Sequence, residues 1–334
     1  MAISRLFKLF ATLTTTLLVA VAISLTSCQR SNSLVMTLDE DAVELLDATE
    51  SPSPVDSSVA TSDPATSVES ESTPPAESNP AAPSVSWKFD DEKGTLEITG
   101  TGSFDGFGSE IDQTRLAKIK VVRGSGAISV DGLRVFAETP QLVEFLWLDA
   151  IFPEGEAARD AFQALVASAP KLKKVRLAGL KLENGKFPEY VLPALAAAPN
   201  LQDLDLSGAA LATSDLAPFA ASGAFPKLAK LTFYQTGVDD QGVETLLPLA
   251  DRLTWLNLDD TKITPGAAPL VAQFANLTFL HVGRTTVDDS CVDSFAKLSK
   301  LEKIHVTRSN TTEEGADKLR AALPNCVVVS QPEN

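Results

Sequence analysis

A short apolar pattern recurs along the C-terminal part of the chain and constrains the fold more than any other feature. Each copy has a leucine followed by apolar residues three and five positions later, and the copies start at Leu116, Leu142, Leu172, Leu201, Leu228, Leu253, Leu277 and Leu301. Successive starts are 26, 30, 29, 27, 25, 24 and 24 residues apart. A period in this range is typical of a solenoid, in which no repeat buries its apolar face alone and each stacks on its neighbours.

Each repeat divides into a strand half and a helix half. The apolar residues of the pattern point inward on a short strand, so the residues between them face the opposite side, because side chains alternate along a strand. Alanine-rich segments in the second half of the repeats have helical apolar spacing. The expected helices are 157–169, 188–198, 241–250, 267–275 and 313–323. The expected fold class is therefore α/β: a horseshoe-shaped solenoid with a parallel sheet on its concave side and helices on its convex side.

A column of hydroxyl side chains follows the strands. Thr236, Thr261, Thr285 and Ser309 occupy the same position in four successive repeats. Hydroxyl groups there can bond otherwise unpaired backbone groups, so we expect these residues to be structural.

The segment before the repeats predicts a β cap. Residues 87–89 and 96–98 alternate apolar and polar side chains around a turn at 90–94, which indicates a β-hairpin. We expect an N-terminal cap over 85–115 and the repeat domain over 116–330.

Two motifs resemble known proteins. The run from Thr236 to Val243 and its counterpart from Thr285 to Asp289 resemble the threonine-valine-threonine-aspartate-x-glycine repeat of bacterial leucine-rich-repeat proteins, a group similar to the ribonuclease-inhibitor type. The segment from Trp87 to Phe104 resembles the N-terminal segment of bacterial surface proteins with leucine-rich repeats. The resemblance implies a leucine-rich-repeat fold and does not specify a ligand.

The first 28 residues read as an export signal. Arg5 and Lys8 precede an apolar stretch over 9–25, and the segment ends in Leu-Thr-Ser-Cys at Cys28. These last four residues resemble a bacterial lipobox, which implies that Cys28 is lipidated. Two alternatives are cleavage after Ala22 and an uncleaved membrane anchor. All three place the remaining chain outside the cytoplasm, on the periplasmic or surface side of the bacterial cell envelope, and the first makes it a membrane-anchored lipoprotein.

Residues 29–84 have a different composition. They are rich in Ser, Thr, Pro, Ala and Glu, and they contain eleven acidic residues against one base, Arg30. Such a segment cannot bury enough apolar surface to offset the entropy of ordering. We expect a disordered acidic tether. The repeat region is also acidic, which argues against nucleic-acid binding, since that requires a basic surface.

The concave side chains suggest a binding surface near the C-terminal repeats. Aromatic residues and both histidines of the chain occupy adjacent rows there. Exposed aromatic residues with polar neighbours are typical anchors of an interface. The candidate ligand-binding residues are Tyr234, Trp255, Asn257, Asp259, Phe279, His281 and His305. The alternative is that these side chains only pack on one another.

Catalytic and metal-binding patterns are weak or missing in the sequence. The chain has no nucleophile elbow, zinc-protease helix or phosphate loop. His281 and His305 with Asp259 are too few firm ligands for a closed metal site. We therefore expect no enzyme activity, no metal and no cofactor. The expected function is a membrane-anchored binding module for a protein, peptide or glycan; the alternative is a structural envelope component without a dedicated ligand.

Overall fold

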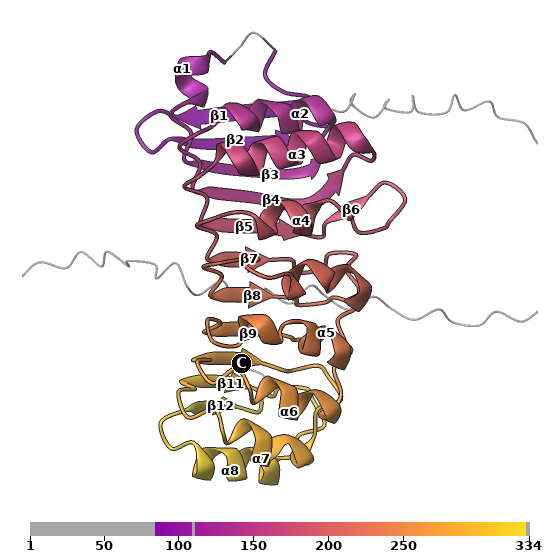
Figure 1. Ribbon diagram of the computed structural model, residues 1–334, viewed down its shortest axis with the longest axis vertical. Coiled ribbons are helices and arrows are strands. Elements are labelled where there is room, and N and C mark those ends of the chain that lie inside the picture. Colours follow the sequence, from indigo (N-terminus) through magenta and orange to yellow (C-terminus); the bar gives the residue numbers. More distant parts are fainter. Residues whose placement is uncertain (1–83, 109–110, 332–334) are drawn as a thin grey trace, which may run out of the picture. The chain divides into compact units, whose positions relative to one another are not determined.

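The computed structural model describes residues 84–108 and 111–331. The predicted signal segment, its Cys28 and nearly all of the predicted tether lie outside this part of the chain. The described residues form one sheet with helices along one side (Figure 1). In Figure 1 the colours follow one another down the stack, so segments adjacent in sequence are adjacent in space.

The sheet is built from short strands that pair in chain order. The strands are β1 Val85–Asp90, β2 Thr95–Gly100, β3 Val121–Ala127, β4 Glu144–Phe152, β5 Lys174–Ala178, β6 Lys181–Leu182, β7 Asp203–Asp205, β8 Lys230–Thr232, β9 Trp255–Asn257, β10 Phe279–His281, β11 Lys303–His305 and β12 Val327–Val329. Their order is β1-β2-β3-β4-β5-β7-β8-β9-β10-β11-β12, and β6 pairs with β4. β1 and β2 form the predicted antiparallel hairpin, and every later pair is parallel.

The inward leucines of successive repeats lie in register and form the core. Leu204, Leu231, Leu256 and Leu280 are consecutive strand partners, and all four are fully buried. Each repeat thus completes the core of its neighbour, as a solenoid requires. This geometry confirms the predicted leucine-rich-repeat solenoid with its parallel sheet and helical side.

Helices cover the other side of the strands. The α-helices are α1 Gln113–Leu116, α2 Val130–Val135, α3 Glu156–Ser168, α4 Val191–Ala196, α5 Asp240–Thr245, α6 Ala268–Val271, α7 Val292–Phe295 and α8 Glu313–Ala322. The 3-10 helices are η1 Phe136–Glu138, η2 Thr213–Ala220, η3 Leu247–Leu249, η4 Pro265–Ala267 and η5 Asp289–Cys291. Each of the five predicted segments contains a helix, but several are shorter or partly 3-10, as at Pro193, Pro248 and Pro269, where proline removes a backbone donor.

The first predicted repeat is out of frame by three residues. We placed its first apolar residue at Leu116, which instead ends α1. Val122 pairs with Phe145, the residue three positions after Leu142, so Ile119 is the counterpart of Leu142. Leu116, Ile119 and Val122 are all buried at a spacing of three, and this spacing made the two frames indistinguishable in the sequence.

The hydroxyl column has the predicted structural role. The Oγ of Thr236, Thr261, Thr285 and Ser309 donates to the carbonyl three residues earlier, at distances of 2.6 to 2.8 Å. These bonds satisfy buried carbonyl groups at the turn that leaves each strand.

A column of left-handed residues lies at the same turn. The residue after each exposed row from β4 to β11, β6 aside, has a positive φ between 48° and 69°. These residues are Asp149, Gly179, Gly208, Gln235, Asp260, Arg284 and Arg308. Only two of the seven are glycine, the residue that adopts this conformation without steric cost.

Candidate ligand-binding surface

The side chains opposite the helices form the exposed face of the sheet. On β9 to β11 the strand register places Trp255, Phe279 and Lys303 in one row and Asn257, His281 and His305 in the next. Neighbouring strands lie about 4.8 Å apart, so partners in a row touch.

Four of these side chains form a continuous cluster, which we call the aromatic ladder: Trp255, Phe279, His281 and His305. The rings of Trp255 and Phe279 stack with centroids 3.5 Å apart and an interplanar angle of 7°. His305 lies 5.6 Å from Phe279 and 4.5 Å from His281, between ring centroids. On the β8 side, Lys230 Nζ lies 5.3 Å from the centre of the Trp255 ring, within cation–π range.

A second cluster lies at the end of the same strands and is centred on Asp259. Arg284 binds this carboxylate through two N–H groups, Nε to Oδ1 at 3.3 Å and Nη2 to Oδ2 at 2.8 Å. The Arg284 guanidinium also lies over the Tyr234 ring, 5.3 Å from its centre. The Asp259 side chain is only 5% exposed, so its charge is paired inside the structure.

His281 joins the ladder to this second cluster. Its Nδ1 lies 3.4 Å from Asp259 Oδ1, but the angles do not make a hydrogen bond, and this buried atom has no other bonding partner among the described residues. Burial lowers the pKa of His281 to about 4, and the positive charges of Arg284 and Lys303 act in the same direction. His281 is therefore neutral at neutral pH.

Gly283 makes room for the Asp259 cluster. A Cβ at this position would lie 2.7 Å from the Thr307 carbonyl oxygen and 3.0 Å from Asp259 Oδ1. The glycine therefore allows the Asp259 carboxylate to approach the backbone that follows β10.

The seven residues predicted from the sequence all belong to the rows of β8 to β11. Trp255, Phe279, His281 and His305 contact one another directly. Tyr234 is linked to them through Arg284 rather than by ring contact. Asn257 turns back and accepts a hydrogen bond from the Asp259 backbone N–H at 2.9 Å. Asp259 is the buried member of the set, and its carboxylate holds Arg284 in place.

Arg284 is the residue that the sequence reasoning missed. It follows the strand rather than standing within it, so side-chain alternation gives no reason to place it on the exposed face. Its left-handed backbone, with φ of 49°, is the feature that distinguishes this position. This conformation has no sequence signature, because aspartate, glutamine, arginine and glycine all occur in the column. The burial of its partner, the Asp259 carboxylate, is likewise visible only in the structure.

Neither metal ligation nor membrane crossing is visible in the described part of the chain. Within residues 84–108 and 111–331, no three His, Cys, Asp or Glu side chains gather closely enough to hold a metal ion. No helix there is both long and apolar enough to cross a bilayer.

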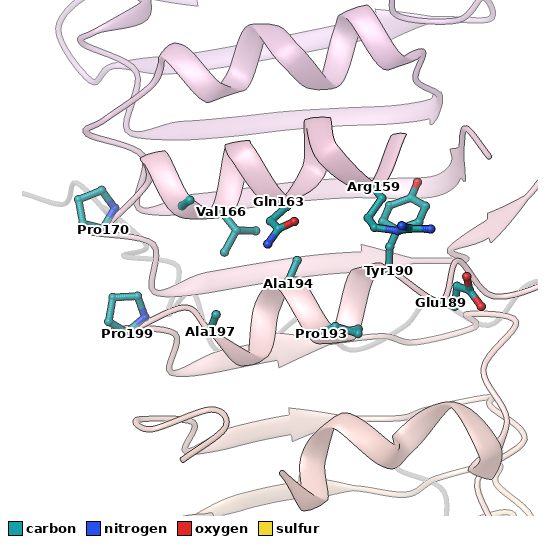
Figure 2. A pocket seen from close by; sticks show the side chains of 11 residues that line it. Arg159, Gln163, Val166, Pro170, Glu189, Tyr190, Pro193, Ala194, Ala197 and Pro199 are labelled. Carbon is teal, nitrogen blue, oxygen red and sulfur yellow. The ribbon is translucent and has the colours of Figure 1, made fainter. Parts of the chain in front are cut away.

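A groove of about 490 Å³ lies on the helical side, away from the predicted residues. It runs between α3 and α4, with Pro170 and Pro199 at one end and Arg159, Glu189 and Tyr190 at the other (Figure 2). Small side chains along its floor, such as Ala194 and Ala197, leave the space open. The Tyr190 hydroxyl donates to the Pro153 carbonyl at 2.8 Å, and burial raises the pKa of this phenol.

Comparison with known proteins yields structures but no family. No family model and no curated protein matches the chain. One similar solved structure is internalin C2 from Listeria monocytogenes, with 17% sequence identity, coverage of 66% of this chain and 84% of that chain, and a TM-score of 0.46. Another is a protein from Bacteroides fragilis, with 19% identity, coverage of 64% and 66%, and a TM-score of 0.43. The fold assignment rests on the strands and register described above.

Proposed function

We propose that this protein is a non-enzymatic binding module, anchored to the bacterial envelope by a lipid on Cys28, that recognises a ligand through the exposed face of β8 to β11. The observation that carries the proposal is the aromatic ladder beside the Asp259 cluster. Large aromatic side chains and arginine dominate the energetics of protein interfaces, and here they lie side by side on one face.

Rigidity supports this site. The ladder is fixed by strand pairing, and the Arg284 guanidinium is held by a buried carboxylate and the Tyr234 ring. Side chains that are ordered before binding lose less conformational entropy when a ligand arrives.

The contacts of His281 support a binding role over a catalytic one. Its ring lies beside Phe279, His305 and Asp259. A catalytic base would need a nucleophile or a substrate proton within hydrogen-bond reach, and Asp259 is already engaged by Arg284.

The test is a double substitution in the ladder. Trp255→Ala combined with Phe279→Ala removes the stacked pair, and we expect loss of partner capture in cross-linking of intact cells followed by mass spectrometry. The far-ultraviolet circular dichroism should stay unchanged, because both side chains lie on the exposed face. Leu146→Ala with Leu148→Ala is the matched control: it truncates two apolar side chains on the same face at β4. Capture that survives the first variant, or self-association as the only product, would contradict the proposal.

A further inference from the structure

The two edges of the sheet carry opposite charge. The loops that lead from a helix into the strands β3 to β12 contain eight cations and only two carboxylates, Asp251 and Glu302. Because these strands are parallel, all of these loops lie at one edge, which is on the left of Figure 1 where β4 to β8 begin. The β1–β2 turn at one end of this edge adds Lys93, Asp91 and Glu92. We call the part from β3 onward the basic edge.

The opposite edge is acidic. The loops that leave the strands β3 to β11 contain seven carboxylates and five cations. The first three residues of the helices that follow add seven carboxylates and no cation. Carboxylates are favoured there because they pair with the unbonded N–H groups of a helix N-terminus, as Asp239 does with the Gly242 N–H. The acidic edge therefore has a cause within the fold.

Helix ends do not explain the basic edge in the same way. Cations are favoured in the last turn of a helix, next to its unbonded carbonyl groups. The last three residues of the helices that precede these strands, however, hold two cations and two carboxylates. The positive excess lies in the loops beyond the helices, where this effect is weak.

The charges of the basic edge are not neutralised within the described residues. Arg252 is half-buried and bonds the Ala224 and Phe225 carbonyls, so it has a structural role. The other seven cations are lysines, which we call the edge lysines. Four of them are exposed and make no ion pair with the described residues: Lys118, Lys120, Lys173 and Lys297.

Three further edge lysines bond only to amide oxygens of a neighbouring loop. The bonds run from Lys171 to Gln141, from Lys227 to Asn200 and from Lys300 to Asn276, at 2.5 to 2.6 Å. An amide oxygen carries no net charge, and an ammonium group has three N–H donors. Each of these lysines therefore keeps its charge and two donors for an external partner.

The residue type and spacing of these cations suit an extended anionic surface. Arginine presents a rigid fork to a single phosphate, whereas lysine is a hydrated point charge on a flexible stem. The edge from β3 to β11 spans roughly 35 Å, at about 4.8 Å for each strand. Lysines spread over this distance do not converge on one small anion. They can instead meet many headgroups of an anionic bilayer at once.

The proposed lipid on Cys28 would bring a bilayer within reach of the repeat domain. The 55 residues between Cys28 and Ser84, where the described chain begins, are long enough for either edge to face the membrane. The charges then decide between the edges, since an anionic surface attracts the basic edge and repels the acidic one.

We propose that the basic edge docks on the anionic headgroups of the bilayer that holds the lipid anchor, with the edge lysines against the phosphates. This inference rests on the anchor of the proposed function and adds an orientation to it. An edge and a face of one sheet are at right angles, so the exposed face of β8 to β11 stands across the plane of the bilayer. The aromatic ladder then stays open to a ligand beside the membrane.

The test compares lysines within one molecule. The full lipid-anchored chain is placed in phosphatidylcholine vesicles with or without about 30% phosphatidylglycerol, and sparse acetylation of its lysines is read by mass spectrometry. The edge lysines should react about fivefold more slowly in the anionic vesicles. Lys181, Lys186 and Lys262 are exposed at the acidic edge and should react equally in both. About 0.5 M salt should abolish the difference, because salt screens exposed charges.

Two triple variants locate the contact. The first removes three edge lysines that make no hydrogen bond within the described residues: Lys120→Gln, Lys173→Gln and Lys297→Gln. The matched variant removes the three lysines of the acidic edge: Lys181→Gln, Lys186→Gln and Lys262→Gln. Lys171 and Lys300 should lose their protection in the first variant and keep it in the second. Equal loss in both variants would overturn the assignment of the surface.

The outcomes separate this inference from the proposed function. If the edge lysines of a membrane-attached chain react equally in both vesicles, the docking is wrong, while the anchor and the binding surface stand. If polyphosphate added to phosphatidylcholine vesicles protects them as well as phosphatidylglycerol does, the edge binds an anionic polymer and the bilayer is the wrong partner. If the chain attaches to neither vesicle, the proposed anchor fails and this inference fails with it.

Discussion

At the scale of single residues, His281 makes the stability of this protein depend on pH. Its folded-state pKa is about 4, below the ordinary value of 6.5. Between pH 4 and pH 6.5, the imidazole of His281 therefore binds a proton in the unfolded chain but not in the folded chain. The free energy of unfolding is fully retained above pH 6.5 and decreases by up to roughly 3 kcal/mol as the pH falls to 4.

This loss is measured by urea unfolding at pH 7 and at about pH 4.5. We expect the wild type to lose more free energy of unfolding on acidification than His281→Gln, which has no proton to bind. His305→Gln is the matched control and should retain the dependence. An NMR titration of His281 with a midpoint near 6.5 would contradict the assignment.

The left-handed column leads to a second prediction at this scale. Gly208 and Gln235 are successive members of the column, with φ of 65° and 55°. Gly208→Ala should lower the free energy of unfolding by about 1 kcal/mol, because a Cβ is strained in this region. Gln235→Gly should relieve the same strain and leave stability unchanged or raise it by up to about 1 kcal/mol. Urea midpoints compare the two; a marked loss for Gln235→Gly would show that the strain is absent.

At the scale of elements, β3 and β4 fit together because Gly124 has no side chain. Gly124 pairs with Trp147, which is fully buried, and a Cβ at position 124 would lie 2.5 Å from the Trp147 ring. The indole Nε1–H donates to the Gly126 carbonyl at 2.9 Å, which fixes the ring in this place.

Gly124→Ala should therefore displace the Trp147 ring and destabilise the protein by about 2 kcal/mol, the range of an overpacked core. The thermal midpoint reports the stability, and near-ultraviolet circular dichroism reports the indole environment. Ser125→Ala, on the next residue of β3, removes only a hydroxyl and should have little effect. An unchanged thermal midpoint for Gly124→Ala would contradict this prediction, since it would mean that β3 and β4 accommodate the methyl group without cost.

The strands and the turns that follow them show which features of the fold can be predicted from the sequence. Inward leucines and the threonine column were predictable, because burial and backbone pairing restrict those positions to a few residue types. The frame of β3 was not, because Leu116, Ile119 and Val122 satisfy the same apolar spacing. The hydrogen bond from Lys120 N–H to the Gly94 carbonyl is one of the contacts that fix the frame, and it joins residues 26 positions apart. The contact of Arg284 with Asp259 depends likewise on a turn conformation shared by unlike residues.

At the scale of the whole molecule, the proposed attachment to the envelope would depend on Cys28. Cys28→Ser should move the protein from the membrane fraction to the soluble fraction and abolish labelling by an alkyne-tagged fatty acid. Cys326→Ser is the control, since this half-buried thiol belongs to the repeat domain. A Cys28→Ser protein that stays in the membrane would favour an uncleaved anchor. A wild-type protein that is soluble would favour cleavage after Ala22.

The parallel register has a consequence for how such a surface changes over generations. Each strand of the exposed face comes from one repeat. The last three repeats start 24 residues apart, at Leu253, Leu277 and Leu301. Duplication or loss of one such unit in the gene would insert or remove a complete strand with its exposed side chains, while the strands on either side keep their parallel pairing. Loss of the unit that carries Phe279 and His281 would bring Trp255 beside Lys303. Recombination between repeats can thus change the side chains that this face presents in a single step.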